Sequence, residues 1–206
     1  MKAETIVKNW VEGEASDILK NIHQTHVNIA IYNRNIRSME DEINSLLTQD
    51  IVFKSSGNIT TILNELTKAI QLDENSKIVQ DIQQLLHHFK EVAKEKSFRF
   101  LLATVNTNMC RKFHMDVNKL RMLCTYSGPG TLWLTEDNIN RKALESYKSN
   151  QFIVINESRI QQAKTGAAII LKGAIYPKEG TKAAVHRSPT IEENGEKRLL
   201  LRIDTN

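Results

Sequence analysis

The chain has 206 residues, of which 40% are hydrophobic and 25% are charged, and its net charge is +4. This length suits one domain with a full core, and the composition is ordinary for a globular protein. The positive charges are dispersed rather than gathered in a dense stripe with aromatic partners, so we predict no nucleic-acid binding. No apolar run approaches the 18 or so residues of a membrane span.

Two cysteines, Cys110 and Cys124, are too few to indicate a disulfide framework in a chain of this length. The N-terminal residues 1–10 contain no apolar stretch of the kind that a signal peptide needs. We therefore expect a cytoplasmic protein with reduced thiols. Neither the oligomeric state nor the substrate can be inferred from the sequence.

The first half of the chain, residues 1–97, is predicted to be mostly helical. Apolar residues recur there at the spacing of amphipathic helices, and two shorter stretches are rich in β-branched and aromatic residues. No repeat and no Pro/Gly-rich linker divides the chain, so we expect a single domain over residues 1–206. The predicted elements are helices over 17–26, 36–47, 58–70 and 76–93, and strands over 27–32 and 51–53.

From residue 98 onward the pattern changes to short strands separated by turn-forming residues. Such spacing indicates a β-sandwich or barrel rather than a parallel α/β sheet. The expected fold class is therefore α+β, with residues 1–97 packed outside a β core formed by residues 98–206. The predicted strands cover 98–105, 120–126, 131–134, 152–155, 167–171, 183–185 and 199–203, with a helical turn over 143–148.

Three residues in this half have the pattern of a metal site. His114 and Asp116 lie two residues apart, and on an extended segment both side chains project to the same side. His186 ends a predicted strand, just before a loop that contains Pro189. A histidine, an acid two residues on and a distant histidine form the set that holds non-haem iron with open positions. The alternatives are a hydrogen-bonded loop pair and a simply packed His186.

Two arginines, Arg198 and Arg202, lie in the last predicted strand and share one face with Leu200. Arginines on an otherwise apolar strand need partners. A carboxylate ligand bound in a barrel mouth would supply one through a bidentate pair. Structural salt bridges to acids such as Glu192 or Glu196 are the alternative.

The two cysteines allow a different metal site. Cys110 lies four residues before His114, and Cys124 shares a strand face with Tyr126. With His114 and His186 they could form a softer site of the zinc type, although the spacing is not that of a zinc ribbon or finger. For Cys124 the alternative is packing in the core.

These segments resemble a bacterial family catalogued only as a domain of unknown function (DUF1826). The resemblance is carried by Cys110-Arg-Lys-Phe-His-Met-Asp116, by residues 121–134 and by His186-Arg-Ser-Pro189, and it covers most of the chain. The family brings no established activity. An association of its members with metal-homeostasis genes points towards zinc.

A second, broader resemblance is carried by the order His114-x-Asp116, His186 and a basic residue about twelve positions on. This order is similar to that of iron(II)- and 2-oxoglutarate-dependent oxygenases, especially the phytanoyl-hydroxylase-like branch. The resemblance implies a double-stranded β-helix (jelly-roll) barrel with helices packed outside. It implies that His114, Asp116 and His186 hold iron, and that Arg198 binds the distal carboxylate of 2-oxoglutarate.

The remaining candidates of this site are weaker. That superfamily often has Ser or Thr two residues after the arginine, where this chain has Leu200, so the anchor is open between Arg198 and Arg202. Tyr126 is a further candidate for binding the cosubstrate. Other candidate site residues are Arg121, Cys110, Cys124 and Trp133.

Three functions are consistent with these patterns. The first is an iron(II)/2-oxoglutarate dioxygenase that acts on an unidentified substrate. The second is a zinc-binding or metal-homeostasis protein on the same scaffold, without oxygenase activity. The third is a β-fold interaction module without a metal. Convergence of the three ligands and Arg198 on one cavity distinguishes the first from the others.

Overall fold

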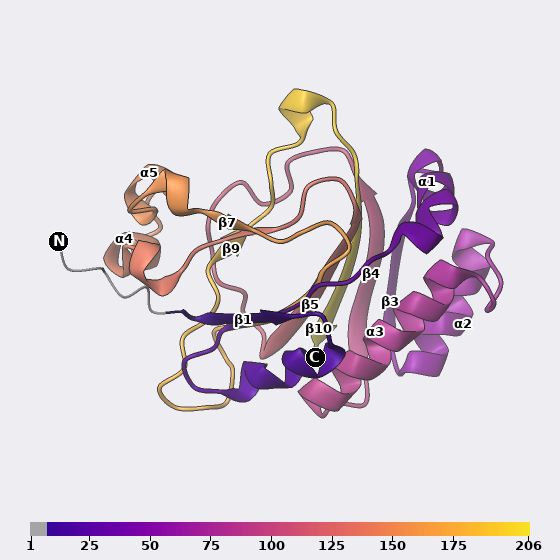
Figure 1. Ribbon diagram of the computed structural model, residues 1–206, viewed down its shortest axis with the longest axis horizontal. Helices are drawn as coiled ribbons and strands as arrows, with labels where there is room; N and C mark the ends of the chain where they lie inside the picture. Colours follow the sequence, from indigo (N-terminus) through magenta and orange to yellow (C-terminus); the bar gives the residue numbers. More distant parts are fainter. Residues whose placement is uncertain (1–7) are drawn as a thin grey trace.

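The computed structural model describes residues 8–206 and has a mixed α/β fold (Figure 1). A seven-stranded sheet has the order β1-β2-β8-β5-β10-β4-β3, and a three-stranded sheet has the order β7-β6-β9. Only β1 and β2 pair in parallel among the described strands. The strands are β1 Trp10–Gly13, β2 Ile29–Tyr32, β3 Val52–Gly57, β4 Phe98–Val105, β5 Leu120–Ser127, β6 Leu132–Trp133, β7 Gln161–Gln162, β8 Ala168–Lys172, β9 His186–Arg187 and β10 Arg198–Thr205.

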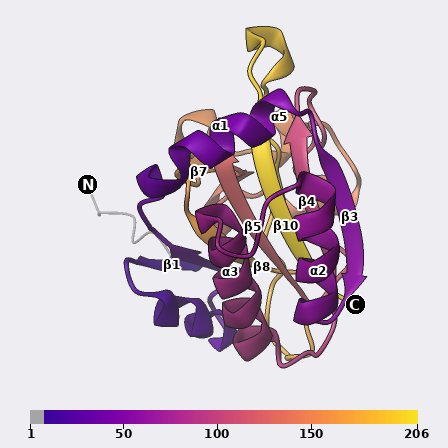
Figure 2. The same ribbon diagram turned by 90° about the vertical axis from the view of Figure 1, so that its right-hand side faces the viewer.

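The longer helices cover one face of the large sheet, as Figure 2 shows for α1, α2 and α3. Helix α2 begins where the side chain of Asn58 accepts a hydrogen bond from the backbone N–H of Thr61 at 2.9 Å. The α-helices are α1 Glu40–Thr48, α2 Ile59–Ile70, α3 Lys77–Ala93, α4 Arg141–Glu145 and α5 Asn150–Ile153. The 3-10 helices are η1 Ser16–His23, η2 Arg37–Met39, η3 Glu136–Asn138, η4 Glu157–Arg159 and η5 Glu192–Asn194.

Buried side chains form three clusters that correspond to the layers of the fold. The largest cluster lies between the long helices and the large sheet and includes Phe89 and Leu201. A second cluster joins the two sheets, with Leu123 and Leu200 on the large sheet and Trp133 on the small one. A third cluster packs α4 and α5 against the segment around Phe113. The space between the two sheets is therefore the interior in which inward-facing side chains of both sheets meet.

Several predicted elements differ from the structure. The predicted helix over 17–26 is the 3-10 helix η1, and residues 8–97 also supply β1, β2 and β3 to the large sheet. The predicted strand over 152–155 is wrong, because Asn150–Ile153 is helical and only Val154 forms a single bridge, to Ile139. The strand expected over 183–185 begins instead at His186.

No helix of residues 8–206 is long and apolar enough to cross a membrane. The predicted absence of a signal peptide concerns residues 1–10, of which 1–7 lie outside the described part of the chain. That expectation therefore stays a prediction.

One buried lysine predicts an unusual dependence of stability on pH. The side chain of Lys172 is 1% exposed, and its Nζ donates to the backbone oxygen of Gln24 at 2.7 Å and lies 4.8 Å from the ring centroid of Tyr176. No carboxylate of residues 8–206 forms a salt bridge with it. Burial, aided by the charge of Lys178, lowers the pKa of Lys172 to about 8.

In the unfolded chain a lysine has a pKa of about 10.4. Between about pH 8 and pH 10.4 the unfolded state therefore binds more protons than the folded state does. Stability should therefore rise through this window, by on the order of 1–3 kcal/mol at most. Urea denaturation of the wild type and of Lys172→Met at pH 7.5 and pH 9.5 measures this contribution. We expect the wild type to gain stability relative to the variant at the higher pH, and an unchanged difference would contradict the assignment.

Candidate metal centre

His114 and His186 lie side by side because their backbones pair directly. The N–H of His114 donates to the carbonyl of His186 at 3.0 Å, and the N–H of His186 donates to the carbonyl of His114 at 3.1 Å. Residues opposite each other in an antiparallel pair project their side chains to the same face. The two imidazole centroids are 4.6 Å apart. Two histidines that are far apart in the sequence thus lie next to each other.

Asp116 joins this pair because it lies two residues after His114 on an extended segment. Its Oδ1 is 3.6 Å from Nε2 of His114, and its Oδ2 is 3.3 Å from Nε2 of His186. One ligand atom from each residue lies within 4.8 Å of the others. Two ligands bound about 2.1 Å from one ion are roughly 3–3.5 Å apart, depending on the angle between them. The three side chains could therefore share a single metal ion.

The protonation of two of these three groups suits a cation. Nδ1 of His114 lies 2.9 Å from the backbone oxygen of Lys112 and donates to it, and Nε2 faces the carboxylate of Asp116. The hydrogen bond to Asp116 raises the pKa of His114. Burial lowers the pKa of His186 to about 4. Although burial alone would raise it, the two histidines and Arg121 hold the pKa of Asp116 at about 2. An ionised acid and neutral histidines are the forms that bind metals, so Asp116 and His186 are already in that form, and a metal ion would have to replace a proton at Nε2 of His114.

Arg121 fixes the orientation of Asp116. Its Nη1 lies 2.6 Å from Oδ1 of Asp116, while its Nε and Nη2 donate to the carboxylate of the buried Asp204 at 2.5 and 3.2 Å. Asn118 also donates to Asp204, at 3.2 Å. Because Arg121 occupies Oδ1, the buried Oδ2 of Asp116 is left with no hydrogen-bond partner in the described structure. That oxygen is the one nearest His186.

Arg198 and Arg202 project into the same interior, as the alternation of β10 predicted. Both line a small cavity of about 50 Å³, together with His114, His186 and Arg121. Arg198 is 1% exposed, and its Nη2 donates a hydrogen bond to Oγ1 of Thr125 at 2.9 Å. Burial lowers the pKa of Arg198 to about 10. The two histidines of the cluster and both arginines thus converge on one cavity, and Asp116 lies beside both histidines.

Two further candidates also lie at this site. Cys110 is exposed and lines the same cavity. Trp133 lies opposite His186 in the pairing of β6 with β9, so the two side chains share a face. Its indole N–H is buried and has no hydrogen-bond partner among residues 8–206.

The structure places Tyr126 and Cys124 on the opposite, helix-covered face of the large sheet, so they do not approach the metal ligands. The hydroxyl of Tyr126 donates to Oδ2 of Asp81 on α3 at 2.6 Å. Cys124 is fully buried in the helix-side core, where its sulfur accepts from Nη2 of Arg34 at 3.2 Å. Strand alternation accounts for this, since Arg121 lies an odd number of residues from both.

This placement predicts a structural effect without a functional one for Tyr126→Phe. The substitution removes the hydroxyl donor to Asp81, so we expect a loss of about 1–2 kcal/mol in the free energy of unfolding. Metal affinity should stay unchanged. Urea denaturation and a metal titration on the same samples test both statements, and a large loss of metal affinity in a folded variant would contradict the placement.

The sequence alone did not single out three residues of this site. Asp204, Thr125 and Arg187 all contact the arginines or line the cavity. Strand alternation indicates Asp204 and Thr125, because each lies an even number of residues from an arginine on its own strand and therefore shares a face with it. For Arg187, adjacency to His186 was the only available sign.

Comparisons with known proteins give a family and some distant structural likenesses. Similar solved structures include a Pseudomonas putida prolyl-4-hydroxylase (9% identity, 92% of this chain and 96% of that chain, TM-score 0.47). Another is a full-length Neurospora crassa protein in complex with alpha-KG and 5-formyluracil (12% identity, 93% of this chain and 77% of that chain, TM-score 0.48). Scores this low assign no activity.

No curated protein matches this chain. One family model, described as "Protein of unknown function (DUF1826)", matches residues 13–204. Since this match spans both sheets and all three metal-type ligands, it confirms the resemblance read from the sequence. The chain belongs to the DUF1826 family.

Proposed function

We propose that this protein is an iron(II)- and 2-oxoglutarate-dependent oxygenase. His114, Asp116 and His186 would hold the metal, and Arg198 would bind the distal carboxylate of 2-oxoglutarate. The observation that carries this proposal is the cluster of three metal-type ligands, two of which, His114 and His186, line a cavity that also contains a buried arginine with no acidic partner among residues 8–206.

The strand arrangement supports the jelly-roll barrel implied by the sequence resemblance. After β5 the chain crosses to the small sheet for β6 and β7, returns for β8, crosses again for β9 and returns for β10. The bridge between His114 and His186 adds the His114 segment to the small sheet β7-β6-β9. This extended small sheet faces strands β8, β5, β10 and β4 of the large sheet. Antiparallel strands that alternate between two facing sheets are the arrangement of double-sheet jelly rolls. These features support our proposal that the scaffold belongs to the double-stranded β-helix class.

The donor set fits iron(II) at such a site. Two imidazoles and one carboxylate leave open positions for other ligands, as in non-haem iron oxygenases. The buried Oδ2 of Asp116 has no hydrogen-bond partner in the described structure, and coordination to a metal ion would compensate for that. The hydrogen bond from His114 to the carbonyl of Lys112 orients the imidazole in the way that metal-bound histidines require.

Arg198 is a better anchor for the cosubstrate than Arg202. Arg202 already has an acid beside it, since its Nε lies 3.2 Å from Oδ2 of Asp204, an ion-pair contact without hydrogen-bond geometry. Arg198 forms no salt bridge with any carboxylate of residues 8–206, and its Nε is buried without a partner. A buried, unpaired cation is costly, and a bound carboxylate would compensate for it through charge-assisted hydrogen bonds. The cavity is small, so binding would displace long side chains that line it.

In the proposed reaction, bound iron(II) would supply the oxidising chemistry, in which 2-oxoglutarate and molecular oxygen would give succinate and CO2, with one oxygen atom entering succinate and the other entering the substrate. The residues of the chain bind, orient and shield the reactants. Arg121 keeps Asp116 ionised and leaves one oxygen free for the metal. The apolar side chains of Leu123, Leu200 and Trp133 limit access of water from between the sheets.

A zinc site on the same ligands is the second candidate function. One observation favours it, namely that the exposed thiol of Cys110 lines the same cavity and is a soft ligand that zinc accepts. Cys124 plays no part in this alternative, because it lies on the other face of the sheet. In this case Cys110→Ser should weaken zinc binding, whereas an iron site that uses three ligands should be insensitive to it.

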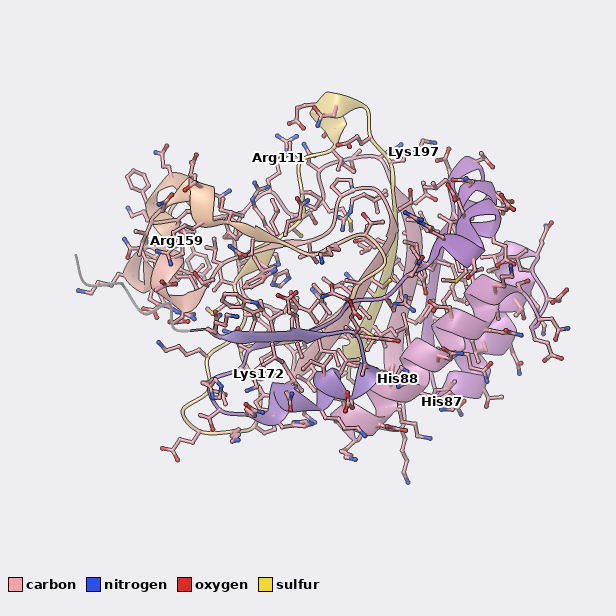
Figure 3. The ribbon with its side chains drawn as sticks, viewed as in Figure 1. His87, His88, Arg111, Arg159, Lys172 and Lys197 are labelled. Atoms are coloured by element: carbon pink, nitrogen blue, oxygen red, sulfur yellow. The ribbon has the colours of Figure 1, made fainter. Side chains whose placement is uncertain are left out.

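Succinate production tests the proposed function directly. The iron(II)-loaded protein should convert 2-oxoglutarate to succinate slowly even without its true substrate, and His114→Ala should remove this activity. His87→Ala serves as the matched control, because His87 is exposed on α3 (Figure 3). The absence of succinate from the wild type, together with zinc binding that depends on Cys110, would favour the zinc alternative.

A further inference from the structure

Asp204 is a buried acid that lies close to the metal ligands without belonging to their cluster. It is located in β10, directly opposite Arg121 of β5 in the sheet register. Its carboxylate accepts from Nε and Nη2 of Arg121 at 2.5 and 3.2 Å and from Asn118 at 3.2 Å, and Nε of Arg202 lies 3.2 Å away. A bidentate pair of this kind fixes both the position and the plane of a guanidinium.

The plane of the Arg121 guanidinium is set by Asp204 rather than by Asp116. Both hydrogen bonds that Arg121 donates to carboxylates in the described structure go to Asp204. With Asp116, Nη1 forms an ion-pair contact, 2.6 Å from Oδ1 but without hydrogen-bond geometry. Arg121 therefore approaches one oxygen of Asp116 and leaves the buried Oδ2, which has no partner among residues 8–206, facing His186 at 3.3 Å.

The backbone of Asp116 is held independently of Arg121. The carbonyl oxygen of Asp116 accepts from the N–H of Ala174 at 2.8 Å, in the turn that follows β8. A Cβ at Gly173 would lie 2.0 Å from the carbonyl oxygen of Asn118, so this turn packs tightly against the segment that carries Asp116. Because the backbone is fixed, the direction of the Asp116 carboxylate depends on rotation of the side chain and on the cations that face it.

Without Asp204, a more favourable arrangement is open to Arg121. A guanidinium that is free to turn towards a neighbouring carboxylate forms two parallel hydrogen bonds to it, which are stronger than a single contact. Such a pair would occupy both oxygens of Asp116 and would compete with a metal ion for Oδ2. We propose that Asp204 is a positioning residue of the metal site, which holds the Nε edge of Arg121 and thereby keeps Oδ2 of Asp116 free for the metal. This inference rests on the metal centre of the proposed function, but it requires neither iron nor 2-oxoglutarate.

Cobalt(II) binding in a double-mutant cycle tests this inference. The wild type, Asp204→Asn, Arg121→Gln and the double variant are each titrated with cobalt(II) alone, in competition with a chelator. The lost charge of Asp204 affects a bound dication in both backgrounds, so the difference between the backgrounds isolates the effect of positioning. We expect Asp204→Asn to weaken cobalt(II) binding at least about tenfold more when Arg121 is present than when it is absent.

Two further variants make the test specific. Asp204→Glu keeps the charge but displaces the carboxylate by one methylene group, so a positioning role predicts about tenfold weaker cobalt(II) binding and a role of charge alone predicts none. This variant carries the test if Asp204→Asn does not fold. Asp81→Asn is the matched control, because Asp81 also pairs with an arginine, Arg34, but lies on α3, on the helix-covered face of the large sheet (Figure 2). It should bind cobalt(II) as the wild type does.

Equal losses in the two backgrounds of the cycle would overturn the inference, because the charge of Asp204 would then account for the whole effect. Unchanged affinity in Asp204→Asn, or an equal loss in Asp81→Asn, would overturn it as well. A wild type that binds no cobalt(II) would overturn this inference together with the metal site. A protein that shows the expected coupling but makes no succinate keeps the role of Asp204 and loses the proposed reaction.

Discussion

Replacing His186 by alanine is expected to weaken the binding of iron(II) by at least about a hundredfold. Loss of an outer partner of a metal ligand alone typically costs about 10–100-fold in affinity, and here one of three ligands is removed. The His186 imidazole is 4% exposed and lies 3.3 Å from Asp116, so no water-exposed side chain can take its place without rearrangement. Competition with a chelator under anaerobic conditions measures the affinity.

His87→Ala is the matched control for this substitution, since it removes an exposed histidine from α3 on the helix side of the molecule (Figure 3). Its affinity for iron(II) should equal that of the wild type. If a folded His186→Ala variant bound iron(II) as tightly as the wild type, the assignment of the three ligands would be wrong.

Replacing Arg198 by methionine is expected to have opposite effects on binding and stability. The affinity of the metal-loaded protein for 2-oxoglutarate should fall about a hundredfold, because a buried charge-assisted bidentate interaction is lost. The free energy of unfolding of the ligand-free protein should rise by about 1–4 kcal/mol, because an unpaired charge is replaced by an apolar side chain of similar length. The hydroxyl of Thr125, which accepts from Arg198, can rotate to another partner.

Arg202→Met is the control for Arg198→Met. It removes a partner of the buried Asp204, so it should destabilise the protein rather than stabilise it. Urea denaturation and a 2-oxoglutarate titration on both variants measure the two effects. The role of Arg198 would be contradicted if its variant bound 2-oxoglutarate normally, and the order of the two arginines would be reversed if only Arg202→Met lost binding.

Much of the candidate site was predictable from local sequence patterns. The spacing of His114 and Asp116 predicts that both project to one side, and the period of two in β10 correctly places Arg198 and Arg202 on one face. The same rule excludes Tyr126, which is five residues from Arg121 on the same strand and therefore faces the helices. Tyr126 is therefore placed away from the metal ligands, and Cys124 packs in the core, which is the alternative that its position on the strand allowed.

Other features depend on long-range pairing that a single sequence does not specify. The bridge between His114 and His186 arises from the register of the small sheet. Strand β1 pairs in parallel with β2, but the sequence of its four residues specifies neither the partner strand nor the register. The run of aromatic and β-branched residues 152–155 has strand propensity, yet Asn150–Ile153 forms a helical turn that packs Ile153 into the cluster under α4. Tertiary packing outweighed local propensity at that position.

The most direct test of the proposed oxygenase is an anaerobic titration of the metal-free protein with iron(II) and then with 2-oxoglutarate. The account predicts a weak visible charge-transfer band when 2-oxoglutarate chelates the iron, and no band in His186→Ala. Iron binding without this band in the wild type would contradict the role of Arg198 as cosubstrate anchor and favour the zinc function. If neither iron nor zinc bound, the convergence of His114, Asp116 and His186 would not be a metal site, and the protein would be better described as an interaction domain.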